Sequence, residues 1–365
     1  MIKKALILEF IITILIAVFL LKRFFYEPKN FLPESISLSP SAPTITEKPL
    51  FTPSFPTLNQ IFQDDHTWIA TLSAERTRTL IATGDVIPAR SVNFQATQRN
   101  NFKWSFEKTA DILRSADLTL INLESPLIND CLLTNEGMIF CGDPRHLEGL
   151  KYAGVDVANL ANNHLGNYEE KGIQSTINLL KTADILSTGT LETIIKDIRG
   201  VRFAFLGYNE IGHSEPMLSW VDKEKITQEI KEAKQRTDII IVSFHWGIEY
   251  TDQPTKRQQD LAYLAIDAGA DLIIGNHPHW IQPVEIYKDK LITYAHGNFI
   301  FDQMWSEKTK QGVVGYYTFY DDQLIDVEFL PILIEDYGQP YFLEGEAKQS
   351  ILEEMKNASF NLSSL

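Results

Sequence analysis

The sequence has few cysteines and little positive charge. Only two of its 365 residues are cysteine, and two sulfurs alone do not complete the tetrahedral site of a structural zinc ion. Lys and Arg number 33 against 48 Asp and Glu, which gives a formal net charge of −15. Because nucleic-acid phosphates are bound through clustered Lys and Arg, this balance argues against a nucleic-acid partner. An anionic ligand would also be repelled, so its binding would depend on metal ions or on a local basic residue.

Internal repeats and a glycine-rich phosphate loop are also missing, since the glycines fall singly in turns. These absences argue against a repeat architecture and a P-loop nucleotide site. The hydrophobic content of 44% is ample for a buried core in a chain of this length. We therefore expect a globular protein with one large domain or two small ones.

One long apolar run lies near the N-terminus. Residues 5–21 are apolar except for Glu9, and basic residues flank them on both sides. This pattern predicts a membrane helix, although the run is slightly shorter than the ~20 residues that span a bilayer. No small-residue cleavage site follows, because the next residues are Arg23-Phe24-Phe25-Tyr26. We predict an uncleaved single-pass anchor in the cell membrane with the globular part outside the cytoplasm, and a cleaved signal peptide is the alternative.

The segment after the anchor is rich in Pro, Ser and Thr up to about residue 56 and has no apolar periodicity. Such a segment predicts an extended linker that holds the globular part away from the membrane surface. From residue 79 onward, apolar runs alternate with helical patterns, as is typical of an α/β domain. The predicted organisation is therefore an anchor at 1–27, a linker at 28–75 and one domain at 76–365.

Cys131 and Cys141 bracket a short segment with Asn135-Glu136-Gly137 near its middle, which is typical of a tight loop whose ends meet. In an exported domain the two cysteines would form a disulfide. In a cytoplasmic domain they would instead remain two unpaired buried thiols.

Helical periodicity separates the apolar runs of the domain. Predicted helices cover 149–153, 172–182, 227–235 and 258–268, and a further helix is expected at 346–356. Two β-rich stretches, 313–320 and 324–330, flank Asp321-Asp322 and predict a hairpin. The order of elements therefore favours an α/β fold whose C-terminal part is rich in β-structure.

Polar groups follow six apolar, β-rich runs at the points where a strand is expected to pass into a loop. The runs are 80–82, 118–121, 157–160, 239–242, 272–275 and 291–294. The groups that follow them are Gly84-Asp85, Asn122-Leu123-Glu124, Asn162-Asn163-His164, His245-Trp246-Gly247, His277-Pro278-His279 and His296-Gly297-Asn298. Imidazole suits Zn, Fe and Mn, a carboxylate can bridge two ions, and an Asn carbonyl adds a neutral oxygen ligand. Together the groups predict a hydrolytic site with two metal ions.

Six ordered strings carry a resemblance to a known family. They are GDVIPAR, NLESPL, LANNH, SFHWGIEY, DAGADLIIGNHPHWIQPVE and HGNFIFDQ. Over about residues 79–356 the chain resembles the CapA-type capsule synthesis family, associated with poly-γ-glutamate production, whose domain is similar to the metal-dependent phosphoesterases related to calcineurin. The resemblance implies a metallophosphatase-like α/β fold of four layers, α/β/β/α, in which two sheets pack face to face.

The resemblance also assigns roles to the polar groups. The implied ligands of one or two divalent ions, Mn, Fe or Zn, are Asp85, Glu124, Asn163, His245, His277 and His279. Asp85 and His279 would hold the first metal, Glu124 would bridge, and the other three would hold the second. Two adjacent ions can activate a water and stabilise both the attacking and the leaving oxygen.

Roles in substrate binding and catalysis follow from the same resemblance. His164 is the implied general acid. The guanidinium of Arg90 would grip a phosphate or carboxylate oxygen, with an ordinary salt bridge as the alternative. Asn122 and Asn162 are assigned to substrate binding.

Residues outside the implied ligand set receive weaker assignments. Glu249 and Asn298 would orient a ligating imidazole, with structural hydrogen bonding as the alternative. His66, His146 and His213 have no motif around them, so they are predicted as surface or loop residues.

The chain departs from the phosphoesterase pattern at three places. Asp85 is followed by Val86 and Ile87 where those enzymes carry Asp-x-His, so the first metal lacks an imidazole ligand. Asn167 stands where the family has an acidic residue, and Asn276 removes one candidate ligand from the Gly-His-His-Pro-His string.

The sequence thus predicts a membrane-anchored, extracytoplasmic protein of capsule or poly-γ-glutamate synthesis, export or processing. As an enzyme it would hydrolyse a phosphoester or amide bond with the help of metal ions. Its expected partners are an anionic polymer or phosphorylated precursor, a membrane-embedded polymer synthase, and the membrane itself through the N-terminal helix. The alternative is a non-catalytic subunit that binds the polymer or the synthase.

Overall fold

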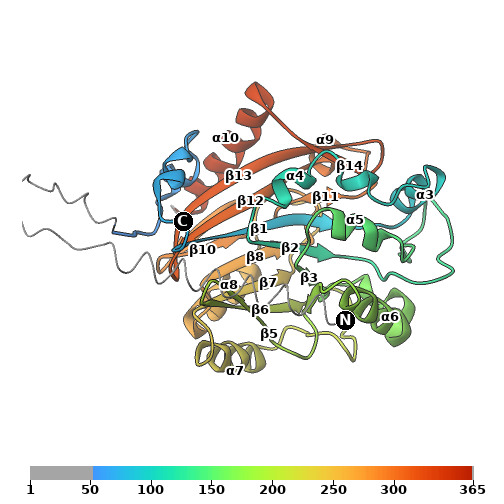
Figure 1. The fold of residues 1–365 in the computed structure, drawn as a ribbon, viewed down its shortest axis with the longest axis horizontal. Helices are drawn as coiled ribbons and strands as arrows, with labels where there is room; N and C mark the ends of the chain where they lie inside the picture. The colour runs from blue at the N-terminus through green and yellow to red at the C-terminus, as the bar shows by residue number, and fades with distance from the viewer. Residues whose placement is uncertain (1–51, 364–365) are drawn as a thin grey trace, which may run out of the picture. The chain divides into compact units, whose positions relative to one another are not determined.

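Two β-sheets with helices on their outer faces make up the part of the chain that the computed structural model describes, residues 52–363 (Figure 1). The predicted anchor at 1–27 and residues 28–51 of the predicted linker lie outside the described residues. Within 52–363, no helix combines the length and apolar character needed to cross a membrane.

The first sheet has eight strands. Seven follow the order β14-β13-β12-β1-β2-β3-β4, and β11 pairs with the end of β1. β1 to β4 are parallel to one another, whereas β12 to β14 join them by antiparallel pairing. The bounds are β1 Thr77–Val86, β2 Leu118–Leu123, β3 Val157–Asn159, β4 Leu186–Thr188, β11 Asn298–Ile300, β12 Gln311–Tyr320, β13 Gln323–Glu335 and β14 Gln339–Phe342.

The second sheet has six strands in the order β5-β6-β7-β8-β10-β9. Its four central strands are parallel and its two edge strands are antiparallel. The bounds are β5 Ile194–Ile198, β6 Val201–Asn209, β7 Ile239–His245, β8 Leu272–Asn276, β9 Val284–Tyr287 and β10 Lys290–Thr293.

Alternate side chains of the strands enter different cores. In β7, Ile239 and Ile241 pack between the sheets, whereas Ile240 and Val242 pack against helices on the outside. The outer face of the first sheet is covered by α3 Ser91–Gln98, α4 Ala110–Leu113, α5 His146–Tyr152 and α6 Glu169–Lys181. The outer face of the second sheet is covered by α7 Lys223–Lys234 and α8 Lys256–Ala268. The predicted four-layer α/β/β/α arrangement is confirmed, because central strands buried on both faces need helices on each side.

The predicted elements appear with shifted ends. All six apolar runs lie in or overlap strands, and the hairpin at 313–330 is formed by β12 and β13. α7 begins four residues earlier than the predicted start at 227, because the Asp222 side chain accepts from the backbone N–H of Lys225 and caps the helix. α8 begins after Thr255, which forms a capping box with Gln258.

Residues 52–75 differ from the prediction of an extended linker. They contain a short helix, α2 Leu58–Ile61, and a 3₁₀ turn at Thr67–Thr71. Leu58, Ile61 and Phe62 are buried in the core between the sheets, beside the terminal helix α10 Gly345–Leu362. These three apolar side chains are too few to show a helical periodicity. The packing of this segment on the domain was therefore not predicted from the sequence.

The parallel strands of both sheets end at one edge, and β11 closes the first sheet there. A Cβ atom on Gly84 would lie 2.2 Å from the backbone oxygen of Gly297, so only glycine permits this close approach. The approach fixes Asp85, whose backbone N–H donates to the same oxygen at 3.0 Å. The end of β1 is thereby held rigidly at the place where the polar loops gather.

Cys131 and Cys141 form a disulfide, as the sequence predicted for an exported domain. The bond closes a loop whose exposed apolar side chains are Leu132, Leu133, Met138 and Ile139. Phe140, next to the second cysteine, is buried instead. The ring therefore places one aromatic side chain inward and leaves its other apolar groups in solvent.

Replacing both cysteines by serine should lower the free energy of unfolding by about 2–3 kcal/mol, because the open loop regains conformational entropy in the unfolded chain. Denaturant unfolding would measure the change, and reduction of the wild type should produce the same loss. Equal stability of the oxidised and reduced proteins would contradict this expectation.

His146 does not lie where the sequence placed it, whereas His66 lies in a loop and His213 is exposed, as predicted. His146 is buried with Nε2 3.1 Å from Asn93 Oδ1. His66 Nδ1 lies 2.8 Å from Asp326, and its Nε2 lies 3.0 Å from the backbone oxygen of Gln63. Both ring nitrogens of His66 thus face acceptors, an arrangement that only the protonated ring satisfies.

A His66→Gln variant should be destabilised by on the order of 1 kcal/mol at about pH 6 and much less at about pH 9. Burial lowers the pKa of His66, but the hydrogen bond and charge of Asp326 outweigh it, and the net pKa is raised. A group whose pKa is higher in the folded than in the unfolded protein stabilises the folded state. This stabilisation is fully present below the unfolded-state pKa of about 6.5 and is lost as the pH rises through the folded-state pKa. Unfolding at the two pH values measures this, and an Asp326→Asn background should abolish the difference.

Candidate metal centre

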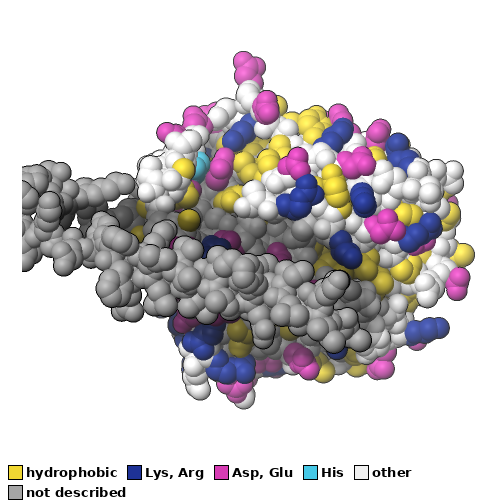
Figure 2. Space-filling model, viewed as in Figure 1, with side chains coloured by type: hydrophobic (Ala, Val, Ile, Leu, Met, Phe, Trp, Pro, Cys, Tyr) yellow, Lys and Arg dark blue, Asp and Glu magenta, His cyan; other side chains and the backbone are white. Residues whose placement is uncertain are grey.

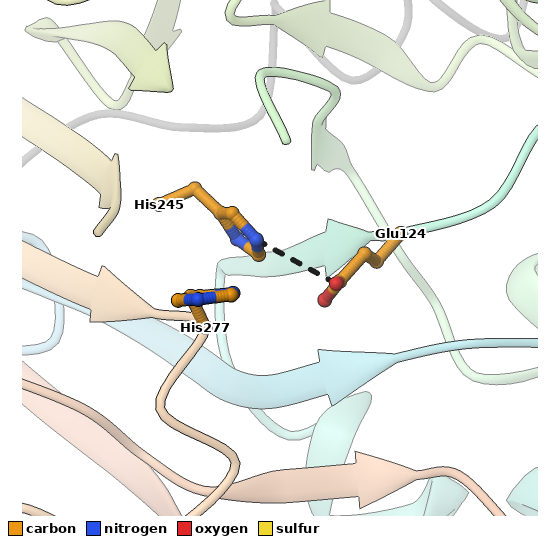
Figure 3. Close-up of side chains that lie close together, drawn as sticks. All are labelled: Glu124, His245 and His277. Atoms are coloured by element: carbon orange, nitrogen blue, oxygen red, sulfur yellow. Dashed lines mark ion pairs between the residues drawn. The ribbon is translucent and has the colours of Figure 1, made fainter. Parts of the chain in front are cut away.

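The ligand side chains predicted from the sequence come from both sheets and meet at their common edge. Asp85 lies in β1, Glu124 follows β2, His245 ends β7, and His277 and His279 lie in the loop after β8. All five are buried. Figure 3 shows Glu124, His245 and His277 directed toward one another, with His245 Nε2 3.5 Å from Glu124 Oε1.

Two groups of ligand atoms lie side by side. In the first, one atom each from Glu124, His245 and His277 all fall within 4.8 Å of one another. Asn163 joins this group, since its Oδ1 lies 2.7 Å from His245 Nε2. This grouping matches the implied second metal position.

The second group consists of Asp85, Glu124 and His279, again with all ligand atoms within 4.8 Å. His279 Nδ1 lies 3.0 Å from Asp85 Oδ2. Glu124 belongs to both groups, which is the geometry expected of a bridging carboxylate. The division of ligands between two positions therefore agrees with the implied one.

Two buried atoms in these groups have no hydrogen-bond partner. They are Glu124 Oε1 and His277 Nδ1. The 3.5 Å approach of His245 Nε2 does not satisfy Glu124, because this nitrogen lies closer to Asn163 Oδ1, at 2.7 Å. An unpaired buried polar atom costs about 1–3 kcal/mol, and more when charged. The donor set of carboxylates and neutral imidazoles therefore fits divalent cations.

The charges within the centre are also unbalanced. The pKa of Glu124 is raised well above its usual value by burial and by the charges of Asp85 and Glu249. Burial alone would raise the pKa of Asp85, but the hydrogen bonds from His279 and Asn122 lower it overall. A cation beside Glu124 would remove the repulsion that opposes its ionisation.

Three asparagines support the carboxylates. Asn122 Nδ2 lies 2.9 Å from Asp85 Oδ1 and 3.2 Å from Glu124 Oε2. Its own Oδ1 accepts from Asn159 at 3.1 Å and from Asn162 at 3.4 Å.

This setting differs from the predicted substrate-binding role of Asn122 and Asn162. Both side chains are buried, and Asn162 also donates to the backbone oxygen of Leu123 at 2.9 Å. Their amides are occupied by internal contacts and hold the ligand loops in place. Asn159, a polar residue within an apolar run, was the sequence signal for this network.

The β8 loop adopts an unusual backbone to present its two histidines. His277 has a φ of 99° and His279 a φ of 58°, both in the region that favours glycine. Such conformations persist only where the surroundings fix them, and they concentrate at functional sites. Asn298 Oδ1 lies 2.9 Å from His279 Nδ1, so Asn298 orients this ring as the sequence analysis expected.

His164 lies next to the two groups, against an aromatic wall. Its ring stacks on Phe140 with centroids 3.9 Å apart. Asn167 Oδ1 accepts from the backbone N–H of Phe140 at 2.6 Å and lies 3.0 Å from His164 Nδ1. Because this oxygen is an acceptor, Nδ1 of His164 carries a hydrogen. Burial lowers the pKa of His164 to about 4, so the ring is neutral near pH 7.

Arg90 is engaged in protein contacts. Its guanidinium pairs with Asp302, and it lies over the rings of Phe140 and Phe301 with its carbon 4.9 and 4.8 Å from their centroids. A further hydrogen bond of 3.2 Å reaches the backbone oxygen of Gly137 in the disulfide loop. Arg90 therefore forms a salt bridge, which was the alternative to a substrate-binding role. Its contact with Gly137 also connects the disulfide loop to the domain.

Glu249 lies closer to the centre than the sequence analysis expected. One of its oxygens lies within 4.8 Å of ligand nitrogens of both His277 and His279. The sequence analysis assigned it only an orienting or structural role. The signal was the string SFHWGIEY, which places this carboxylate four residues after a candidate ligand.

The chain is similar in sequence to known proteins. A model of the family described as bacterial capsule synthesis protein PGA_cap matches residues 79–303. Capsule biosynthesis protein CapA of Bacillus anthracis is 30% identical over 284 residues, which cover 72% of this chain and 68% of that protein. PGA biosynthesis protein CapA of Bacillus subtilis is 30% identical over 251 residues, which cover 64% of this chain and 66% of that protein.

A solved structure is also similar to this chain. It is described as a novel phosphatase from Mycoplasma pneumoniae and aligns with a TM-score of 0.49 and 16% identity, covering 72% of this chain and 95% of that one. The chain spans about two thirds of the length of the two CapA relatives. On the family match over more than half of its length and the 30% identity to a capsule protein, the chain belongs to the bacterial capsule synthesis protein family.

Proposed function

We propose that this chain is a metal-dependent hydrolase that cleaves a phosphoester or amide bond during capsule or poly-γ-glutamate synthesis, export or processing. The observation that carries the proposal is the pair of ligand groups that share Glu124, whose Oε1 is buried without a hydrogen-bond partner. Such a shared carboxylate between two sets of imidazole and carboxylate ligands is suited to a centre with two ions. The ions would be Mn, Fe or Zn.

The names of the relatives support an anionic polymer or its phosphorylated precursor as the substrate, since they are described as capsule and PGA biosynthesis proteins. The chain itself has a net charge of −15. On the face shown in Figure 2, Lys and Arg side chains are interspersed with Asp and Glu and form no single basic patch. Binding of a polyanion would then depend on the ions at the centre, not on the general surface charge.

The residues of the chain have separable roles in this proposal. Asp85, Glu124 and His245 would hold the ions, which when bound activate water and neutralise charge on the scissile group. Asn122 positions the two carboxylates through its amide. His164, whose neutral ring carries its hydrogen on Nδ1 against Asn167, would first take up a proton at Nε2 and then pass that proton to the leaving group.

The proposal includes a location. The apolar run at 5–21 would anchor the chain in the cell membrane, and the segment up to residue 51 would connect it to the domain. A membrane-embedded polymer synthase is the proposed partner at that place. The disulfide fits an extracytoplasmic domain, because such bonds persist in oxidising compartments.

One observation favours a second candidate function, a non-catalytic subunit that binds the polymer or the synthase. His164 is paired with the neutral amide of Asn167, not with a carboxylate, and burial lowers its pKa to about 4. The ring therefore lacks a partner that would stabilise the protonated form of a general acid. In this case the ions would only coordinate carboxylates of the polymer.

A His245→Ala variant should lose at least half of the bound metal and at least about 100-fold in hydrolysis, since a lost ligand costs more than a lost supporting residue. Metal per chain would be measured by elemental analysis, and hydrolysis on a chromogenic phosphodiester and on poly-γ-glutamate. His213→Ala, whose ring is exposed and outside both groups, is the matched control and should change neither. Metal-free wild-type protein would overturn the proposal.

A His164→Ala variant separates the two candidate functions. If His164 is the acid, the variant should keep its metal and lose about 100-fold or more in turnover, and cells that depend on it should form no polymer. Polymer formation at the wild-type level with this variant would exclude the enzymatic role and support the binding subunit.

A further inference from the structure

Glu249 lies on a loop that the backbone fixes beside the two histidines after β8. Gly247 and Tyr250 turn this loop through left-handed conformations, with φ of 88° and 60°. The backbone N–H of Tyr250 donates to the oxygen of Pro278, between the histidines, at 2.8 Å. Ile248 is exposed, whereas Glu249 is half-buried. The loop therefore holds the carboxylate against the centre.

The carboxylate is within ligand range of both histidines. One Glu249 oxygen and one nitrogen each from His277 and His279 all lie within 4.8 Å of one another. Atoms that bind a common ion at about 2.0–2.2 Å lie within about 4 Å of one another, so little adjustment is required. This third group shares one histidine with each of the two groups described above.

The position of Asp85 and His279 has the fewer protein ligands. Besides these two it has only the shared Glu124. Ile87 stands where the related phosphoesterases carry an imidazole, and it is a fully buried apolar side chain, as is Val86. They cannot supply a ligand, so this position needs a group from another loop.

A second observation concerns a histidine of the third group. His277 Nδ1 is buried without a hydrogen-bond partner, and the side chain is only 4% exposed. A buried nitrogen of this kind is normally paired. Within residues 52–363, the ion pairs of Asp85 and Glu124 are with histidines, and neither carboxylate pairs with Lys or Arg.

We propose that Glu249 is the metal ligand that replaces the missing imidazole and completes the ion position of Asp85 and His279. The inference rests on the proposed metal-dependent function and deepens it. With Asp85, Glu124 and Glu249 this position is rich in carboxylate oxygen and suits Mn²⁺, whereas the position of His245 and His277 suits Zn²⁺ or Fe²⁺. The centre is thus built for two unlike ions.

The test titrates Mn²⁺ into full-length protein that has first received one equivalent of Zn²⁺. Bound and free Mn²⁺ are distinguished by their electron paramagnetic resonance signals. Wild type should bind one Mn²⁺ per chain beside the Zn²⁺. Glu249→Gln should weaken Mn²⁺ binding by at least about 10-fold and leave the affinity for the first Zn²⁺ within about twofold. Glu249→His should weaken Mn²⁺ binding and tighten binding of a second Zn²⁺.

Asp252→Asn is the matched control. Asp252 lies on the same loop, belongs to none of the three groups, and pairs with Lys308 at 3.1 Å. Its substitution removes the same charge and should leave Mn²⁺ binding unchanged. If Asp252→Asn and Glu249→Gln weaken Mn²⁺ binding equally, the loss comes from the removed negative charge and not from a lost ligand. This result would overturn the assignment.

The outcomes separate this inference from the proposed function. Wild-type protein that binds neither ion would remove the metal-dependent function and the assignment together. Wild-type protein that binds both ions, with Glu249→Gln unchanged, would overturn only the assignment. As a control for folding, the metal-free variants should unfold at the same temperature as the metal-free wild-type protein.

Discussion

The burial of two carboxylates at the ends of neighbouring strands is the constraint on which the site depends. Asp85 and Glu124 have no exposed surface. Removing a charge from water costs several kcal/mol unless hydrogen bonds or an opposite charge compensate. Asp85 has such compensation from Asn122 and His279, whereas Glu124 Oε1 has none from the described residues. The asparagine network therefore compensates only part of the cost of burying the two carboxylates.

The fold makes such a burial possible because the site lies where two rigid sheets end together. β1 and β2 deliver the carboxylates, and β7 and β8 deliver the histidines. The core between the sheets prevents these strands from moving apart, since interiors pack as densely as organic crystals. His296, in the loop between β10 of the second sheet and β11 of the first, has its Nε2 2.9 Å from the hydroxyl of Tyr317 in β12. Because the strands are fixed, the final positions of the histidine side chains depend on the loops that follow the strands. The loop of His277 has a strained backbone.

Much of the site could be predicted from the sequence because each ligand directly follows, or ends, an apolar strand. Asp85, Glu124, His245, His277 and His279 were placed in this way, and the structure brings them together. The disulfide was predictable because its cysteines are close in sequence. Both inferences needed only local order along the chain.

Contacts between distant parts of the chain could not be predicted. The partner of Arg90 is Asp302, 212 residues away, and no pattern in the sequence connects them. Asn122 and Asn162 were assigned to the substrate because a sequence cannot show that an amide is already occupied. The proximity of Glu249 to His279 could not be predicted either, since it arises from a backbone turn and a hydrogen bond to Pro278. Residues 58–62 were predicted to be linker because their few apolar side chains form a core only by packing with distant residues, such as those of α10.

The closed ring between Cys131 and Cys141 has a consequence for the surroundings of His164. Its buried side chain, Phe140, lies flat against the imidazole, while Leu132 and Ile139 remain in water. The ring that supplies the phenyl wall of His164 therefore also presents an apolar surface to solvent, beside the exposed acidic side chain of Glu136.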